Sequence, residues 1–266
     1  MCTVCGCGEP EDPGEVAQGQ DHAHHHHDDI HHYGQGPAHA HAPGLSQSRM
    51  VQIEQDILAR NNAYANANRR WFTEHGILAL NLVSSPGSGK TTLLTRTIDD
   101  LKGQLFLAVI EGDQQTMNDA NRIRETGAPV VQVNTGKGCH LDSHMIHHAI
   151  EKLKPESGSI VMIENVGNLV CPSLFDLGEG NRVVIISVTE GDDKPIKYPN
   201  MFESSQLCII NKTDLLPYVP FDVEKAMEYA RQVNPKLEFI QLSAYTGEGM
   251  DKWYEWLAVR QNTVSV

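Results

Sequence analysis

The segment "SSPGSGKTTLLTRTIDD" constrains the fold more than any other part of the chain. It follows the apolar run "ILALNLV", which is typical of a buried strand, and it leads into a helical pattern. Gly87, Gly89, Lys90 and Thr91 match most of the phosphate-binding pattern G-x-x-x-x-G-K-[ST], although Ser84 replaces its first glycine. Small residues let successive backbone N–H groups turn inward around a phosphate at a helix N-terminus. A strand, a phosphate loop and a helix are therefore predicted, unless a Gly-rich turn matches the pattern by chance.

The side chains of this loop have separate predicted roles. Lys90 is expected to reach the β- and γ-phosphates of a nucleotide, and the Thr91 hydroxyl is expected to hold Mg²⁺. Ser88 and Thr92 complete the predicted nucleotide-binding loop. Lys90 and Thr91 are therefore also candidate catalytic residues.

Short apolar runs alternate with helix-length segments along the rest of the chain. After the first strand come "LFLAVIEGD", "PVVQVN", "SIVMIEN", "RVVIISVTE", "QLCIINKTD" and "LEFIQLS". Strands that are apolar nearly throughout are typical of a parallel sheet covered by helices on both faces. We therefore predict a doubly wound, mostly parallel α/β domain over residues 76–266, preceded by a helical lead-in over residues 46–75.

Two later motifs resemble the guanine-reading loops of the GTPase superfamily. "NKTD" ends one apolar strand, and "SAYTGEG" ends the next. By that resemblance, Asp214 accepts two N–H bonds from guanine, Lys212 lies along the base, and Asn211 ties its loop to the phosphate loop. The backbone of Ser243 and Ala244 is expected to meet the guanine oxygen. Adenine would leave these buried groups unpaired, so the resemblance implies GTP rather than ATP.

Two acidic residues end strands that should face the phosphate loop. Asp113 ends "VIEGD" and Glu164 ends "VMIE", where a second Mg²⁺ ligand is required, either directly or through water. The alternative for each is a solvated acid at a strand end. Gly167 in "ENVG" resembles the γ-phosphate sensor of GTPase switch loops, with Glu164 in place of the usual Asp. Asn168 follows it, so the water-orienting Gln of many small GTPases has no counterpart and intrinsic hydrolysis should be slow.

Cysteine and histidine recur beside these predicted switch segments. "GKGCHLD" places Cys139 next to His140, and "GNLVCPS" places Cys171 four residues after Gly167, on a segment expected to respond to the γ-phosphate. Two thiolates and one imidazole suit a transition metal whose geometry depends on the bound nucleotide. The alternative for each cysteine is a small buried hydrophobe, which we predict for Cys208.

His144 and His148 recur at four-residue steps from His140. Such spacing predicts one helical face, which is either an additional set of metal ligands or an ordinary exposed face. The exposed face is the preferred interpretation.

The chain opens "MCTVCGC", which places Cys2, Cys5 and Cys7 in a motif over residues 1–8. The α-amino group could supply a fourth ligand, and three thiolates with one amine suit a square-planar Ni²⁺ site. The alternative is a set of idle thiols in an unstructured end.

Residues 9–45 form a tract of His, Asp, Ala, Gly and Pro that has too few apolar groups to offset the entropy of ordering. We predict a disordered linker whose imidazoles bind Ni²⁺ weakly and exchangeably, as a reservoir. The interrupted spacing argues against a purification tag. The candidate ligands are His22, His24, His25, His26, His27, His31, His32, His39 and His41.

The amino-acid composition restricts the binding partners and the cellular compartment that can be expected for this chain. Lys and Arg number 21 against 34 Asp and Glu, and the formal charge of -13 opposes binding to nucleic acid. The beginning of the chain lacks the pattern of a signal peptide, and no apolar run approaches the length of a membrane helix. A cytoplasmic protein with no membrane partner is therefore expected, and its six cysteines are better explained as ligands, reactive thiols or core residues than as disulfides.

Taken in order, these motifs resemble one family, the hydrogenase nickel-incorporation GTPases (HypB), with the urease accessory GTPases as more distant relatives. The resemblance covers residue 50 to the end and the N-terminal cysteines. It implies a P-loop G domain of the SIMIBI type that hydrolyses GTP to GDP and phosphate and delivers Ni²⁺ to the large subunit of [NiFe]-hydrogenase. It also implies a GTP-promoted homodimer that carries Cys139, His140 and Cys171 at its contact, and a nickel-binding partner, HypA.

The resulting hypothesis is a switch in which GTP and Mg²⁺ order the loops around Asp113 and Gly167 and bring the metal ligands of two protomers together. A nickel store, and a GTPase that inserts nickel into urease or cobalamin into a mutase, are the alternatives. The paired metal motifs argue against the cobalamin version. Cysteine and histidine also suit Zn²⁺, so the metal at each site stays open.

Overall fold

The computed structural model describes residues 47–113, 118–136 and 138–264. The predictions for the N-terminal cysteines and the His tract lie outside these residues. Contacts divide the chain into two units, Met1–Asp56 and Ile57–Val266. The described part of the first unit is the beginning of helix α1, and the α/β body belongs to the second unit.

The body is built on a seven-stranded sheet in the order β3-β2-β4-β1-β5-β6-β7, and every neighbouring pair is parallel. This confirms the predicted doubly wound fold. The strands are β1 (Leu78–Ser84), β2 (Leu107–Asp113), β3 (Val130–Asn134), β4 (Ile160–Glu164), β5 (Asn181–Ser187), β6 (Leu207–Asn211) and β7 (Glu238–Gln241).

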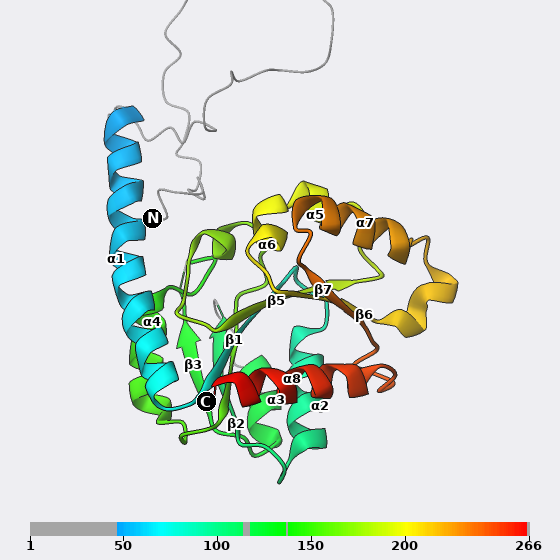
Figure 1. Cartoon of the computed structure of the whole chain (residues 1–266), viewed down its shortest axis with the longest axis horizontal. Helices are drawn as coiled ribbons and strands as arrows, with labels where there is room; N and C mark the ends of the chain where they lie inside the picture. Colours follow the sequence, from blue (N-terminus) through cyan, green and yellow to red (C-terminus); the bar gives the residue numbers. More distant parts are fainter. Residues whose placement is uncertain (1–46, 114–117, 137, 265–266) are drawn as a thin grey trace, which may run out of the picture. The chain divides into compact units, whose positions relative to one another are not determined.

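Helices connect consecutive strands, as parallel pairing requires. Figure 1 shows them on both faces of the sheet. The α-helices are α1 (Gln47–Glu74), α2 (Lys90–Leu101), α3 (Asn118–Glu125), α4 (Ser143–Leu153), α5 (Lys194–Lys197), α6 (Pro199–Glu203), α7 (Val223–Val233) and α8 (Met250–Val264). Two 3-10 helices, η1 (Cys171–Leu174) and η2 (Thr213–Tyr218), follow β4 and β6. No helix within the described ranges has the length and apolar character needed to cross a membrane.

Successive residues of the central strand β1 face opposite layers of the core. Leu78, Leu80 and Leu82 pack in a cluster with helices α2, α3 and α8, whereas Ala79 and Val83 belong to two clusters that include α1, α4, α6 and α7. Because alternate side chains of a strand point to opposite faces, a strand buried on both sides must be apolar throughout. This explains why every residue of "LALNLV" is apolar except Asn81, which is also buried.

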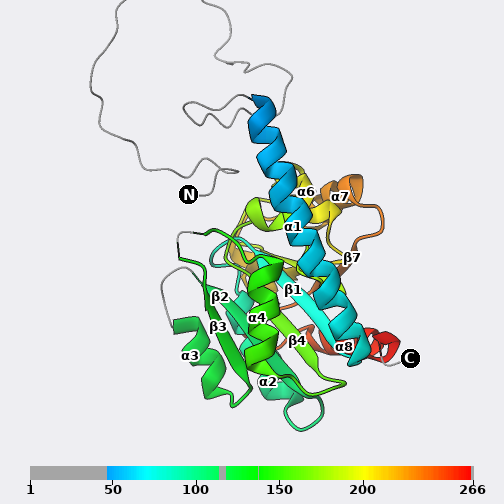
Figure 2. The ribbon, with the colours of Figure 1, turned by 90° about the vertical axis from the view of Figure 1, so that its left-hand side faces the viewer.

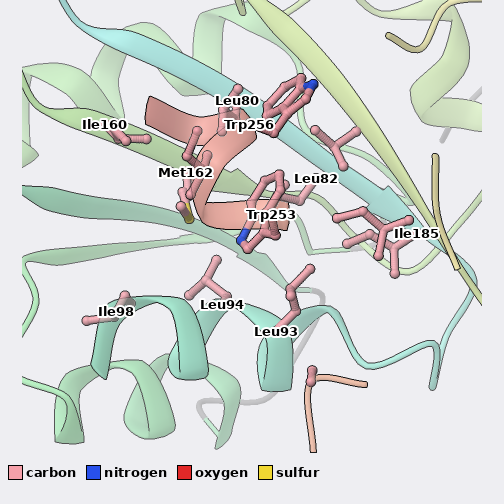
Figure 3. Packing of buried hydrophobic residues seen from close by; sticks show 14 of the residues in the cluster. Leu80, Leu82, Leu93, Leu94, Ile98, Ile160, Met162, Ile185, Trp253 and Trp256 are labelled. Atoms are coloured by element: carbon pink, nitrogen blue, oxygen red, sulfur yellow. The ribbon is translucent and has the colours of Figure 1, made fainter. Parts of the chain in front are cut away.

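The cluster beneath α2 and α8 is centred on Trp253, which is fully buried. Figure 3 shows its indole between the side chains of β1 and those of Leu93 and Leu94 on α2. The Trp253 Nε1–H donates to Thr97 Oγ1 at 2.9 Å, so the one polar atom of the ring is paired. This packing fixes helix α2, which begins at the phosphate loop, against the sheet.

β1 lies between β4 and β5, where the order of the strands reverses. The loops that leave neighbouring strands at such a point run in opposite directions and open a crevice at the carboxyl ends. The fold therefore places the phosphate loop after β1 and the segment after β4 beside one crevice.

A buried ion pair fixes the segment after η1. Arg182 and Glu179 have side chains only 6% and 7% exposed, and Arg182 Nη2 lies 2.9 Å from Glu179 Oε1. The same guanidinium donates to the carbonyl oxygens of Ser173 and Phe175, at 3.2 and 2.8 Å. The pair therefore connects β5 to the segment that carries Cys171.

Arg182→Met is expected to lower the free energy of unfolding by about 3 to 5 kcal/mol, because it leaves the Glu179 carboxylate buried without its cation. The matched control is Arg69→Met, which removes an ion pair to Asp176 whose side chains are 42% and 41% exposed. That loss should stay below about 1 kcal/mol. Urea denaturation of both variants beside the parent measures the difference, and equal losses would contradict the assignment.

Candidate nucleotide and metal site

The phosphate loop joins the end of β1 at Ser84 to the start of α2 at Lys90. Gly87 and Gly89 have φ values of +76° and +91°, in the left-handed region that favours glycine. A Cβ at Gly89 would lie 2.5 Å from Asn211 Nδ2. The loop geometry therefore accounts for the glycines of the motif at these positions.

Ser84, which replaces the first glycine of the motif, is buried and paired. Lys90 Nζ donates to Ser84 Oγ at 2.9 Å, and Ser84 Oγ donates to the Ser85 carbonyl at 2.7 Å. The serine side chain thus holds the lysine ammonium beside the loop, which is a contact that a glycine cannot make.

The "NKTD" loop lies directly against the phosphate loop. Asn211 Nδ2 donates to the Ser88 carbonyl at 2.8 Å, and Lys212 Nζ donates to the Gly87 carbonyl at 2.7 Å. Lys212 itself has a positive φ of 63°, which turns the chain sharply after β6. These bonds hold the two predicted nucleotide-binding loops together across 123 and 125 residues of sequence.

The remaining residues predicted to bind guanine differ in whether their polar groups have hydrogen-bond partners within the protein. Asp214 Oδ1 is buried without a hydrogen-bond partner among the described residues, as expected of a group aimed at a ligand. In contrast, Ser243 N–H donates to the Glu248 carbonyl at 2.9 Å, and Ala244 N–H donates to Asn211 Oδ1 at 3.1 Å. These two N–H groups, expected at the guanine oxygen, are used here to hold the loop and Asn211.

A cavity of about 530 Å³ lies at the carboxyl ends of β1, β2 and β4. It gathers ten of the predicted site residues, from the phosphate loop, the strand ends, the switch glycine and the "NKTD" loop. Its lining residues are Ser84, Pro86, Gly87, Ser88, Gly89, Lys90, Thr91, Thr92, Asp113, Asp119, Arg122, Glu164, Val166, Gly167 and Lys212. Asp119 and Arg122, both on α3, were not predicted from the sequence, because that helix carries no motif of its own.

Ionisable groups of this cavity are buried close to one another and to Glu111, which lies opposite Glu164 on strand β2. Burial lowers the pKa of Lys90, an effect that the neighbouring Glu164 charge opposes. Burial raises the pKa of Glu164, whose Oε1 accepts a hydrogen bond from Thr91 Oγ1 at 2.6 Å. Burial and then the Glu164 charge raise the pKa of Glu111 from 4.5 to about 8. The raised pKa therefore keeps Glu111 mostly protonated at neutral pH, and a cation bound beside these carboxyl groups would favour their ionised forms.

Two of these carboxylate oxygens, Glu111 Oε2 and Glu164 Oε2, are buried without hydrogen-bond partners among the described residues. Hard divalent cations such as Mg²⁺ prefer oxygen ligands of this kind. The Thr91 hydroxyl and Asp113, which lines the cavity, add further oxygens. The oxygens of Thr91, Asp113 and Glu164, which line the cavity, fit Mg²⁺. Glu111, which was not among the predicted ligands, lies opposite Glu164 on the neighbouring strand β2 and does not line the cavity.

Gly167 lies against the phosphate loop. A Cβ at this position would lie 3.1 Å from Pro86 Cα, so a larger residue would push the segment after β4 away from the loop. The close approach accounts for the glycine in "ENVG" and places this segment at the wall of the cavity, beside the phosphate loop.

The three predicted metal ligands Cys139, His140 and Cys171 come together. Their ligand atoms all lie within 4.8 Å of one another, and Cys139 Sγ is 3.7 Å from His140 Nδ1. Burial lowers the pKa of His140, which favours the neutral imidazole that binds metals. Its ring stacks on Phe175 with centroids 4.0 Å apart. Soft sulfur ligands with one imidazole suit Ni²⁺ or Zn²⁺.

The segment after β4 joins the nucleotide cavity to this metal cluster. Asn165 directly follows Glu164, and its Oδ1 accepts hydrogen bonds from Leu141 N–H at 3.1 Å and Val166 N–H at 3.0 Å. Three residues further, Asn168 Nδ2 donates to the Cys139 carbonyl at 3.4 Å. The loop that carries two of the metal ligands is therefore bonded to the backbone and side chains of the switch segment.

The prediction that His140, His144 and His148 share one helical face is wrong. Helix α4 begins at Ser143, where Asp142 caps it by accepting from Met145 N–H at 2.8 Å. His140 lies before the cap, whereas His144 and His148 are exposed on the helix. Cys208 is fully buried on β6, as predicted.

Residues 78–241 match a family model described as CobW/HypB/UreG, nucleotide-binding domain. The chain is 54% identical, over 97% of its length and 96% of the relative's, to hydrogenase maturation factor HypB of Rhizobium leguminosarum bv. viciae. Its identity to HypB of Escherichia coli (strain K12) is 50%, over 98% and 99% of the two chains.

Among solved structures, HypB of Helicobacter pylori in complex with nickel matches with a TM-score of 0.72 and 35% identity, over 77% of this chain and 96% of that one. HypB of Archaeoglobus fulgidus matches equally well in fold, with a TM-score of 0.72 and 40% identity, over 76% and 99% of the two chains.

Proposed function

Because this chain belongs to the CobW/HypB/UreG family, and within it to the hydrogenase maturation factors HypB, we propose that it is a nickel metallochaperone driven by GTP. It is a GTPase, and in this proposal GTP promotes a homodimer in the cytoplasm that passes Ni²⁺ to the hydrogenase large subunit, with HypA as a nickel-binding partner. The observation that carries the proposal is the bonding of Asn165 to both the switch segment and the loop of Cys139.

The nucleotide part of the proposal rests on the buried charges of the cavity. Lys90 supplies a buried cation for the β- and γ-phosphates. Thr91, Asp113 and Glu164 would hold Mg²⁺, which neutralises the charge that develops on the transferred phosphoryl group. Asp214 Oδ1, which has no hydrogen-bond partner among the residues that the structure describes, favours guanine, because it can accept hydrogen bonds from the guanine N–H groups. GTP and GDP are thus the expected nucleotides.

Slow intrinsic hydrolysis is consistent with the position of Asn168. Its carboxamide donates to the Cys139 carbonyl and accepts from Val170 N–H at 2.8 Å, so both ends are engaged outside the nucleotide cavity. No Gln follows Gly167 to orient the attacking water. A slow step would keep the GTP state, and the metal geometry that accompanies it, in place long enough for a partner to bind.

The switch acts through the segment after β4. A γ-phosphate beside Gly167 would hold that segment against Pro86, and Asn165 and Asn168 would transmit its position to the loop of Cys139. Loss of the γ-phosphate would release the segment and change the arrangement of the three metal ligands. A ligand moves such an equilibrium only by its differential affinity for the two states, and a few kcal/mol are enough.

Nickel titration of the purified full chain tests this proposal. Absorption in the thiolate-to-metal charge-transfer region should differ in intensity or in apparent affinity between the protein with a non-hydrolysable GTP analogue and the protein with GDP. A shift of the monomer–dimer equilibrium should accompany it in analytical ultracentrifugation. Identical spectra, affinities and masses in the two nucleotide states would refute the coupling.

Urease is a second candidate client, because HypB of Helicobacter pylori, 38% identical over 81% of this chain, is named a hydrogenase/urease maturation factor. A nickel store is a candidate of a different class, with the His tract as its binding segment. Deleting residues 21–43 separates storage from delivery, since a GTP-driven inserter retains hydrogenase maturation when nickel is plentiful and a store loses its role.

A further inference from the structure

Helix α1 carries two buried asparagines that face the α/β body. Asn68 is fully buried and Asn61 is 6% exposed, and the two residues lie about two helical turns apart. Figure 2 shows α1 alongside α4. A buried carboxamide needs partners for both its donor and its acceptor, so the groups that it binds show what it holds in place.

Both asparagines bind the start of helix α4. Asn61 Oδ1 accepts from Ser143 N–H at 2.9 Å, and the Ser143 hydroxyl donates to the Asn61 carbonyl at 2.6 Å. Asn68 Nδ2 donates to the Ser143 carbonyl at 2.8 Å. Ser143 is fully buried and lies four positions after Cys139. The side chains of α1 therefore fix the end of the loop that carries Cys139 and His140.

The same two carboxamides also bind the segment that follows η1. Asn61 Nδ2 donates to the Asp176 carbonyl at 2.8 Å, and Asn68 Nδ2 donates to the Leu177 carbonyl at 3.1 Å. These carbonyls lie five and six positions after Cys171. Each asparagine thus bridges the two chain segments that supply the ligands of the metal cluster.

The turn after η1 packs between α1 and a metal ligand. Gly178 has a φ of +88°, and a Cβ there would lie 2.5 Å from the Ala65 carbonyl oxygen and 2.7 Å from Asn68 Cβ. At the other end of the turn, the Phe175 ring stacks on His140 with centroids 4.0 Å apart. A shift of this turn relative to α1 would therefore also move the surroundings of the His140 imidazole.

We propose that Asn61 and Asn68 are positioning residues of the metal cluster, which hold the segments of Cys139 and Cys171 at the separation that lets their sulfurs bind one ion. Ligands that are already held in place lose less conformational freedom when the metal binds. Hydrogen-bond partners outside the ligand set can change metal affinity by about 10-fold to 100-fold. The inference rests on the metal site of the proposed function but not on its nucleotide switch.

Asn61→Asp tests the proposal most sharply. The aspartate retains an oxygen for Ser143 N–H, but it places an oxygen in place of the donor against the Asp176 carbonyl. The matched control is Asn234→Asp, at the end of α7, away from the metal cluster. Asn234 Nδ2 likewise donates to two carbonyls, those of Phe202 and Ser205, at 3.0 and 2.9 Å, and its Oδ1 accepts from Lys236 N–H at 3.1 Å.

The measurement is a Ni²⁺ titration of the full chain without nucleotide, followed by thiolate-to-nickel absorption. A chelator of known affinity fixes the free Ni²⁺ concentration. The parent and both variants carry three substitutions that confine the sulfur absorption to the cluster, because Cys208 is fully buried in the core. These substitutions are Cys2→Ala, Cys5→Ala and Cys7→Ala.

Asn61→Asp is expected to raise the free Ni²⁺ concentration at half-saturation by about tenfold or more, although all three ligands are present. Asn234→Asp should stay within about twofold of the parent. Urea denaturation of both variants shows how far each loses stability. A half-saturation point of Asn61→Asp equal to that of the parent, with stability lowered as in the control, would make the bridges merely structural and would overturn the inference.

Two further outcomes are decisive. If the parent with the three substitutions develops no sulfur absorption, the cluster does not bind nickel, and the metal part of the proposed function fails together with the inference. If Asn61→Asp does not fold, exchange of the Ser143 amide hydrogen in the parent replaces it, since this N–H donates to Asn61 Oδ1. Ni²⁺ should slow that exchange, because coupling between two sites is reciprocal. An unchanged exchange rate at saturating Ni²⁺ would overturn the inference.

Discussion

Lys90→Ala is expected to lower kcat for GTP hydrolysis by about a thousandfold or more, which corresponds to about 4 kcal/mol of lost transition-state stabilisation. The ammonium of Lys90 is buried beside Ser84, and the neighbouring Glu164 charge opposes the loss of its proton that burial favours. A water molecule cannot replace a fixed cation in that position, because the energetic value of the cation depends on its exclusion from solvent. Phosphate release at saturating GTP and Mg²⁺ measures the loss.

The matched control for this change is Lys102→Ala, at the other end of helix α2. Lys102 Nζ donates to the Thr126 carbonyl at 2.9 Å, and Lys102 does not line the cavity. This variant should hydrolyse GTP at a rate within about threefold of the parent, since it loses only a surface contact. A Lys90→Ala protein that retained more than a tenth of the parental rate would exclude the proposed role of the phosphate loop.

The second large effect is expected from the double substitution Cys139→Ala, Cys171→Ala. Removing both sulfurs leaves His140 as the one remaining ligand of the three-residue cluster. The thiolate-to-nickel absorption of this cluster should disappear, and its nickel affinity should fall at least about a hundredfold, because each lost ligand costs at least about 1.4 kcal/mol. Any sulfur absorption that persists would arise from other cysteines and should not respond to the nucleotide.

The response to nucleotide is the discriminating measurement. In the double variant, nickel affinity and dimerisation should no longer change between GDP and a non-hydrolysable GTP analogue. If both quantities still change as in the parent, the coupling lies elsewhere in the protein. GTP hydrolysis should continue in this variant, because neither cysteine lines the nucleotide cavity.

Asn165→Ala tests the coupling between the nucleotide cavity and the metal cluster without removing a metal ligand. It leaves all three ligands in place but removes the acceptor shared by Leu141 N–H and Val166 N–H. Nickel should still bind, and the difference between the two nucleotide states should shrink. Asn134→Ala, at the start of the loop that carries Cys139, removes an exposed bond to Gly136 N–H at 2.7 Å that does not reach the switch segment, and it should leave the difference unchanged. Melting temperatures of both variants verify that the fold survives the loss of a buried acceptor.

Much of the fold could be predicted from the sequence, because its signals are local. The apolar runs indicated a parallel sheet because strands buried on both faces need apolar residues at nearly every position. The phosphate loop and "NKTD" could be located because each motif is contiguous and the backbone geometry depends on its own residues, such as Gly87 and Gly89. These two motifs also predicted seven of the residues that line the cavity, namely Gly87, Ser88, Gly89, Lys90, Thr91, Thr92 and Lys212.

The sequence could not predict which carboxylates and amides share one buried environment. Glu111 looked like one acid among several at the end of a strand, yet burial beside Glu164 raises its pKa to about 8. His140 appeared to begin a histidine stripe, but the Asp142 cap starts the helix after it. Burial depends on partners that lie far away in the chain, whereas the start of α4 depends on the local Asp142 cap, which the histidine spacing did not take into account.

The sequence by itself therefore determined the class of fold, the phosphate loop and the identity of the chemical groups, because these depend on residues that are neighbours along the chain. Only the tertiary structure decided that Cys139 and Cys171, thirty-two positions apart, share a cluster. It also decided that Asn165 joins this cluster to the nucleotide cavity. The physical reason is the parallel order of β3, β2, β4 and β1, which brings the segments that follow different strands to the same edge of the sheet.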